Sequence, residues 1–211
     1  MGEMTHEENY QLDVAGYLIL PGVLSSAELA ACNAALDRLQ PEDEPLRWSE
    51  PTHTPLSALR HHPVLTRYLE QICGAGFHID VSPHLLRSTE ATAATPLQGG
   101  GEWVDWSRAY LQHQGMRFCQ AVTAVWALAD AEEEDGGLVV VPASHNSTLA
   151  APEDLRTGAD DMGVVAQPVL NAGDLMLCAE LLMRGLRPWT GSGPQRLLAC
   201  GYVSDRARPS A

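Results

Sequence analysis

The chain has 211 residues and a formal net charge of −14, and all thirteen of its basic residues are arginines. This length suits one domain that buries an apolar core without disulfides or a structural metal, so we expect one domain over residues 1–211. The negative charge would be repelled by phosphate backbones and anionic lipids. Nucleic acid and membrane surfaces are therefore excluded as expected partners.

Targeting signals are not evident in the sequence. The first nine residues are polar and acidic, and no apolar run approaches the ~18 residues of a membrane-spanning helix. The five cysteines form no C-x-x-C pair, as is typical of free thiols in a reducing compartment. We expect a cytoplasmic protein, and the absence of lysine beside abundant alanine and arginine suggests a bacterial gene of high GC content.

The N-terminal part begins with a strand pattern and a helix pattern. Residues 16–20 are apolar and are followed by a Pro-Gly pair, which predicts a short strand and a turn. Ser25 and Glu28 have the spacing of a capping box. Apolar residues then recur every three or four positions, which predicts a helix up to residue 39.

A loop and a second helix are predicted next. Residues 41–55 contain four prolines among acidic residues, a composition that favours a surface loop. From Pro63, a residue suited to a first helical turn, apolar residues follow at helical spacing until Gly74. We therefore expect a helix over residues 63–73.

Beyond residue 76 the sequence consists of short apolar stretches separated by turn residues. These predict strands at 77–81, 84–88, 122–129, 138–141, 164–169, 174–178 and 197–203. Two helices ahead of many short strands predict a mostly β (α+β) fold, a jelly roll with the N-terminal helices packed on one face.

Four stretches also carry motifs that keep one order along nearly the whole chain. They are 13–25, 96–100 with 113–119, 125–145 and 172–189. The third contains Gly-Gly-Leu-Val-Val-Val-Pro-Ala-Ser-His, and the fourth contains a Gly-Asp pair at the start of an apolar stretch. Together they resemble the phytanoyl-CoA dioxygenase family of the iron(II)/2-oxoglutarate oxygenases. The resemblance implies a cupin-like double-stranded β-helix whose mouth holds metal, 2-oxoglutarate and substrate, although a jelly roll alone implies no function.

The resemblance also locates the iron ligands, which in this superfamily are two histidines and one carboxylate. Matching residue by residue puts the first histidine at Gln98, the carboxylate at Gly100 and the distal histidine at Arg184. Gln98 offers a neutral amide oxygen, Gly100 offers no side chain, and Arg184 is a permanent cation without an acceptor. Because a guanidinium repels a divalent cation, we expect no metal and no cofactor.

Two arginines have alternative interpretations. Arg196 lies twelve residues beyond Arg184 and matches the family's arginine that grips a carboxylate of 2-oxoglutarate. It is thus a candidate for binding 2-oxoglutarate or a substrate carboxylate, unless it is a surface arginine. Arg184 either replaces the positive charge of iron and holds an anionic or carbonyl group, or fills the pocket in a pair with Glu180 or Glu102.

Aromatic residues follow the glycine stretch, where relatives place loop residues over the cavity. Trp103, Trp106 and Tyr110 are therefore candidate substrate contacts, and Glu180 is a further candidate. Packing in the core or at an oligomer contact is the alternative for the aromatic side chains.

Acid–base candidates come from the same region. Glu102 and Asp105 are the acids nearest to the lost ligand positions and are candidate general bases, together with Glu180. His113 could act as an acid or base near neutral pH, or be a hydrogen-bonded structural residue. His78 and Asp80 form an H-x-D pattern on a predicted strand, where both face one side and, with His84 or His113, could form a relocated metal site; satisfied structural residues are the alternative.

The chain lacks the iron ligands expected at the matched positions but keeps the other pocket motifs. We therefore predict a metal-independent, redox-neutral enzyme of bacterial secondary metabolism, such as a cyclase, isomerase or lyase. Its substrate would be a small apolar molecule with a carbonyl or carboxylate. Arg184 would stabilise negative charge, Gln98 would orient the ligand, and Glu102, Asp105 or His113 would move the proton.

Two alternatives stay open. The chain could be a non-catalytic partner of an active homologous oxygenase in a hetero-oligomer, or it could form an oligomer with itself. It could also be an active dioxygenase that uses Fe(II) and 2-oxoglutarate at an atypical metal site.

Overall fold

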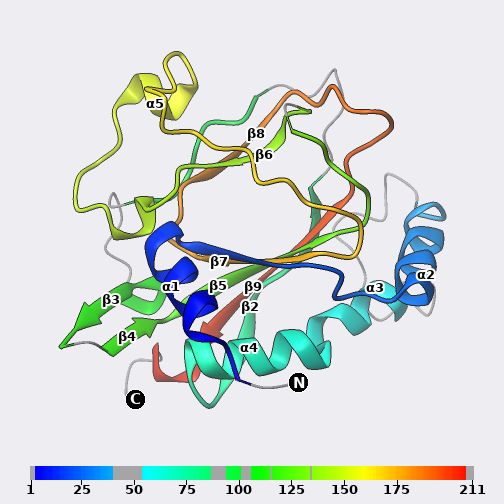
Figure 1. The fold of residues 1–211 in the computed structure, drawn as a ribbon, viewed down its shortest axis with the longest axis horizontal. Coiled ribbons are helices and arrows are strands. Elements are labelled where there is room, and N and C mark those ends of the chain that lie inside the picture. The colour runs from blue at the N-terminus through cyan, green and yellow to red at the C-terminus, as the bar shows by residue number, and fades with distance from the viewer. Residues whose placement is uncertain are drawn as a thin grey trace.

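The fold is built around a five-stranded antiparallel sheet with a smaller sheet facing it (Figure 1). The computed structural model describes residues 3–39, 54–86, 94–100, 106–114, 116–133 and 135–207. The large sheet has the order β1-β7-β5-β9-β2, formed by β1 (Tyr17–Leu20), β7 (Leu175–Ala179), β5 (Ala121–Ala127), β9 (Leu197–Ser204) and β2 (Phe77–Leu86). The smaller sheet pairs β6 (Gly137–Val140) with β8 (Arg184–Arg187). A separate ribbon of β3 (Tyr110–His113) and β4 (Met116–Cys119) extends from one end.

Four helices cover the face of the large sheet that points away from β6 and β8 (Figure 1). They are α1 (His6–Ala15), α2 (Ser26–Leu36), α3 (Thr54–Ala58) and α4 (Pro63–Cys73). A short helix, α5 (Glu153–Thr157), lies on the side of the smaller sheet. The predicted fold class, a mostly β jelly roll with N-terminal helices on one face, is confirmed.

Side-chain alternation along the strands separates two apolar regions of the core. On β9, Leu198, Cys200 and Tyr202 pack with the helices, whereas Leu197 and Ala199 pack toward the smaller sheet. This alternation follows from the two-residue period of a strand. The parity of a residue in β9 therefore decides whether it faces the helices or the space between the sheets.

The expected elements agree with the structure where apolar periodicity is strong. The Ser25–Glu28 capping box is present at the start of α2, and α4 begins at Pro63 and ends at Cys73. The two strands predicted over 77–81 and 84–88 form the single strand β2, which contains register shifts against β9. Of the predicted loop 41–55, residues 54 and 55 belong to α3 and the rest lies outside the described residues.

Two differences have local causes. The strand predicted over 164–169 is wrong, because Ala166 makes only an isolated bridge to Val140 and its neighbours stay unpaired. Helix α1 was not predicted, because Leu12 is its only buried residue and no apolar stripe marks it. The Thr5–Glu8 capping box, present in the structure, was the sequence signal that could have predicted this helix.

In the described parts of the chain, no helix has the length and apolar character needed to cross a membrane.

The helical layer supplies a testable contribution to stability. Leu69 of α4 is completely buried against the sheet. Replacing it with alanine leaves a cavity, so Leu69→Ala is expected to lower the free energy of unfolding by about 2–5 kcal/mol, as measured by urea denaturation. The matched change Leu149→Ala removes a 77% exposed side chain and is expected to stay within ~0.5 kcal/mol of the unchanged protein. Equal effects of the two changes would contradict the packing of α4 on the sheet.

Candidate functional site

A cavity of about 320 Å³ lies between the large sheet and the β6–β8 pair. Its walls are mainly apolar, with the side chains of Val81, Leu86, Val125, Leu138, Leu186 and Ala199 among them. Its polar residues are Thr95, Gln98, Thr123, Glu180, Arg184 and His84. A small concave site with apolar walls and a few polar groups is the usual form of a small-molecule site. We therefore treat it as the candidate active site.

Strand pairing brings the polar residues of this cavity together. Thr123 and Val125 share one face of β5, and Arg184 and Leu186 share one face of β8. Gln98 pairs with Arg184 through reciprocal backbone hydrogen bonds, in which the N–H of each residue donates to the carbonyl of the other at 2.9 Å. The segment around Gln98 thus continues the β6–β8 sheet by one short bridge.

The guanidinium of Arg184 is held by four hydrogen bonds. Its Nη1 donates to the carbonyl oxygens of Glu180 at 3.0 Å and Leu182 at 3.3 Å. Its Nη2 donates to Oγ1 of Thr123 at 3.1 Å and to Oε2 of Glu180 at 3.2 Å. All four Nη hydrogens are therefore used. Of the N–H groups of this guanidinium, only Nε–H has no acceptor among the described residues.

The carboxylate of Glu180 links Arg184 to a second ion pair. Its Oε2 accepts from the hydroxyl of Thr123, and its Oε1 accepts from Nη1 of Arg108 at 3.2 Å. Nη2 of Arg108 in turn donates to a carboxylate oxygen of Asp80 on β2. Two cations and two anions thus form one continuous network at the polar end of the cavity, and the side chain of Glu180 is 16% exposed.

Part of the site was expected from the sequence. Glu180, Arg184 and Gln98 do line one cavity, and the pairing of Arg184 with Glu180 is present. Thr123 and Arg108 were not singled out, although Thr123 lines the cavity; His84, named only as a possible third ligand beside His78 and Asp80, lines it as well. The available signal for Thr123 was a lone hydroxyl in the otherwise apolar stretch of β5.

The position of Arg196 corrects an expectation. Its Nη2 donates to Asp37 at 2.7 Å and its Nη1 to Asn33 at 2.9 Å, so its guanidinium contacts the end of α2. It has the same parity as Leu198 and faces the helices, not the cavity. It is not placed to hold a ligand carboxylate in this cavity.

Tyr110 also faces the helical side. Its hydroxyl donates to Asp13 of α1, and its ring packs edge-on against His145 with 4.5 Å between the ring centroids. Burial raises the pKa of Tyr110, and the bond to Asp13 adds to this shift. Core packing, the alternative to a substrate contact, describes Tyr110 correctly.

Five of the expected site residues have side chains that the structure does not describe. Glu102, Trp103 and Asp105 lie outside the described residues, as do the side chains of Trp106 and His113.

His78 and Asp80 have separate partners. Nδ1 of His78 lies 2.8 Å from Asp205, whereas Asp80 binds Arg108. The described residues hold no cluster of three or more histidine, cysteine or acidic side chains suited to a metal ion. The structure does not bring His78 and Asp80 into a shared metal site.

At the positions that the motifs match to the iron ligands, the chain has Gln98, Gly100 and Arg184, of which Gln98 alone offers a side-chain lone pair. Gln98 and Arg184 lie at the cavity, and Arg184 directs a cation toward Glu180 and Thr123. Gly100 has φ +81°, and a Cβ added there would lie 3.0 Å from Cγ of Met183. A carboxylate-bearing residue at position 100 would therefore require both backbone strain and movement of Met183.

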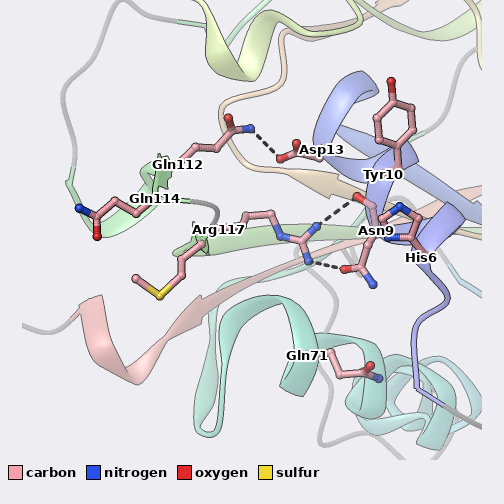
Figure 2. A pocket seen from close by; sticks show the side chains of 9 residues that line it. His6, Asn9, Tyr10, Asp13, Gln71, Gln112, Gln114 and Arg117 are labelled. Carbon is pink, nitrogen blue, oxygen red and sulfur yellow. Dashed lines mark hydrogen bonds between the residues drawn. The ribbon is translucent and has the colours of Figure 1, made fainter.

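A second, more open cavity of about 650 Å³ lies between α1 and the β3–β4 ribbon (Figure 2). Its polar side chains bond to one another across the opening. Arg117 donates to the backbone and side-chain oxygens of Asn9, and Gln112 donates to Asp13 at 2.7 Å. This cavity is larger and is lined by residues on both sides of His113, but its lining contains none of the positions matched to the iron ligands, so we regard it as a surface depression.

Comparisons with known proteins place the chain in a family. The model of the phytanoyl-CoA dioxygenase family matches residues 12–185, and the chain belongs to this family. No curated protein sequence matches it.

Several solved structures share the fold. HygX from Streptomyces hygroscopicus, with nickel and 2-oxoglutarate bound, is 24% identical with a TM-score of 0.77, and the match covers 96% of this chain and 88% of HygX. SnoN from nogalamycin biosynthesis, a non-heme α-ketoglutarate-dependent epimerase, is 20% identical with a TM-score of 0.68, over 94% of this chain and 82% of SnoN. EctD from S. alaskensis, with 2-oxoglutarate and 5-hydroxyectoine, is 18% identical with a TM-score of 0.72, over 98% of this chain and 78% of EctD. At these identities the likeness establishes a common fold.

The network around Thr123 yields a stability prediction. Thr123→Val keeps the shape of the side chain but removes the hydroxyl, which leaves Nη2 of Arg184 and Oε2 of Glu180 each without one partner. We expect a loss of about 1–3 kcal/mol in the free energy of unfolding, measured by urea denaturation. Thr123→Ser keeps the hydroxyl and serves as the control, with a smaller loss expected. If valine and serine gave the same stability, the hydroxyl would have no part in holding the network.

Proposed function

We propose that this chain is a metal-independent enzyme that binds a small organic molecule in the cavity between its two sheets and catalyses a redox-neutral step. The observation that carries the proposal is the guanidinium of Arg184, fixed by four hydrogen bonds at the polar end of an apolar cavity. It stands at the position matched to the distal histidine of the iron site. A fixed cation in a site of low dielectric is the usual means of stabilising developing negative charge.

Loss of the metal site follows from the donor set. Iron(II) needs lone pairs from nitrogen or oxygen, and the matched positions supply one neutral amide, no side chain and a cation. A divalent ion beside Arg184 would meet electrostatic repulsion of several kcal/mol at an intermediate effective dielectric. With Arg196 bonded to α2, the site also lacks the arginine expected to grip 2-oxoglutarate. We therefore propose that neither iron nor 2-oxoglutarate takes part.

The available groups suit proton transfer next to a carbonyl. The Nε–H of Arg184 can donate to the carbonyl oxygen while negative charge develops on it, and the amide of Gln98 can orient the same group. Glu180 can take a proton from the neighbouring carbon through Oε1 and return it to another carbon of the same substrate. The substrate then isomerises with no net change in electrons or protons. Glu102, Asp105 and His113 remain proposed alternatives for moving the proton.

Neighbours on the same fold provide context for a chemistry of this kind. SnoN is an epimerase, so its fold supports a reaction that rearranges a substrate without adding atoms to it, although SnoN depends on α-ketoglutarate. HygX holds nickel and 2-oxoglutarate in its crystal structure. An active oxygenase is therefore the alternative against which the proposal has to be tested.

Metal analysis separates these two possibilities. The protein is purified without chelator, supplied with Fe(II) and 2-oxoglutarate, and analysed for bound iron and for released succinate, with HygX, whose crystal structure holds iron, as the control for iron loading. We expect iron far below one equivalent and no succinate above the background without enzyme, because Arg184 excludes the ion. Stoichiometric iron together with succinate release would establish an active dioxygenase and refute the proposal.

Complementation of a gene deletion tests the role of Arg184. A deletion strain of the source bacterium is complemented with the unchanged gene, with Arg184→Ala or with Arg187→Ala, and the metabolite lost on deletion is followed in cell extracts. Arg184→Ala is expected to lower its rate of formation ~100-fold or more, the scale of a charge-stabilising donor. Arg187 belongs to the same strand but forms an exposed pair with Asp161, so Arg187→Ala is expected to restore formation. Full restoration by Arg184→Ala would favour a non-catalytic partner subunit.

A further inference from the structure

The polar end of the cavity is balanced in charge. Arg108 and Arg184 supply two positive charges, and Asp80 and Glu180 supply two negative charges, all linked through direct contacts. Among the described residues, each arginine of this network is paired with a carboxylate, so neither has a charge left over to neutralise a ligand. A ligand carboxylate would lie beside the carboxylate of Glu180 inside a protein whose formal net charge is −14.

The geometry of the free donors leads to the same conclusion. Tight binding of a carboxylate by arginine uses two parallel N–H groups of one guanidinium. Both Nη groups of Arg184 already donate twice to protein oxygens, so only its Nε–H can reach a ligand without breaking a bond. A single N–H donor matches a single oxygen atom.

The other polar groups can complete the contacts of one neutral oxygen group. The side-chain amide of Gln98, exposed in the cavity, can both donate and accept, and among the described residues no partner occupies it. Oε1 of Glu180 receives one bond, from Arg108, and keeps capacity to accept another. A hydroxyl or carbonyl with an adjacent acidic hydrogen would satisfy both residues and Arg184.

The walls define the rest of the ligand. The side chains of Val81, Leu86, Val125, Leu138, Leu186 and Ala199 offer no hydrogen bonds, and the volume of about 320 Å³ is near the lower end of ligand sites. The body of the ligand should therefore be compact and apolar, such as a small ring system.

From these observations we infer that the ligand of this cavity is an uncharged, compact apolar molecule that presents a hydroxyl or carbonyl oxygen to Arg184, and is not a carboxylate. The inference rests on the proposed function of the cavity and narrows its substrate class. Its physical basis is that Glu180 already neutralises the cation that a ligand anion would need.

Two probes of equal shape test the inference. Benzamide and benzoate differ mainly in charge, and their dissociation constants for the full chain are measured at pH 7 by ligand-observed NMR. Benzamide is expected to bind at least ~tenfold more tightly than benzoate, which corresponds to a difference of about 1.4 kcal/mol in binding free energy. Leu186→Trp fills the cavity from its half-buried wall and is expected to abolish binding of benzamide.

A charge-switch variant supplies the decisive comparison. Glu180→Gln keeps the size of the side chain but removes one negative charge from the network, so the ratio of affinities should shift ~tenfold toward benzoate. Asp37→Asn also removes one negative charge from an ion pair with arginine, but outside the cavity, and is expected to leave the ratio unchanged. Melting curves establish that each variant is folded, and if Leu186→Trp does not fold, the shift caused by Glu180→Gln decides alone.

The outcomes separate this inference from the proposed function. Tighter binding of benzoate than benzamide by the unchanged protein, or an equal shift in Glu180→Gln and Asp37→Asn, overturns the inference and leaves the cavity as a ligand site. Failure of both probes to bind, or binding that a folded Leu186→Trp does not affect, counts against the inference and the proposed site together.

Discussion

The positive charge of Arg184 is the feature on which the rest of the site depends. A guanidinium placed among apolar walls loses much of its hydration, and it is stable there only if neighbouring groups replace the lost interactions. Glu180 and Thr123 provide those groups, together with two carbonyl oxygens of the turn that leads into β8. The side chain that would be most harmful to a metal ion is thus also the one that the surrounding structure holds in place.

This arrangement requires cooperation between elements that are far apart in the chain. Thr123 comes from β5, Arg184 from β8 and Asp80 from β2, with Glu180 on the turn between β7 and β8. The antiparallel pairing of β5 with β7 sets Thr123 close to Glu180, and the hydroxyl then connects acid and guanidinium. A network of this kind is sensitive to the loss of any one member, because each removal leaves a polar group short of a partner.

The comparison with known structures shows how a fold and its chemistry separate. The chain shares the jelly roll of its family, and HygX, which has the same fold, holds nickel and 2-oxoglutarate in its crystal structure. A shared fold does not by itself fix the chemistry, which depends on the side chains that the strands carry. Gly100 shows how local packing selects a residue: its positive φ and the nearby side chain of Met183 favour glycine.

The sequence by itself determined the family and the fold class, because motifs and apolar periods are local properties, and it led to the expectation that the three matched ligands are replaced. It also indicated that Arg184 and Glu180 could pair. The tertiary structure decided the side on which each residue lies. Arg196, which lies just before β9, matched the family's motif by spacing, yet its guanidinium bonds to Asp37 at the end of α2, and the hydroxyl of Tyr110 bonds to Asp13 of α1. Thr123 became visible only when β5 and β7 were paired, since the register between two distant strands arises from packing of the whole core and is not written in either strand alone.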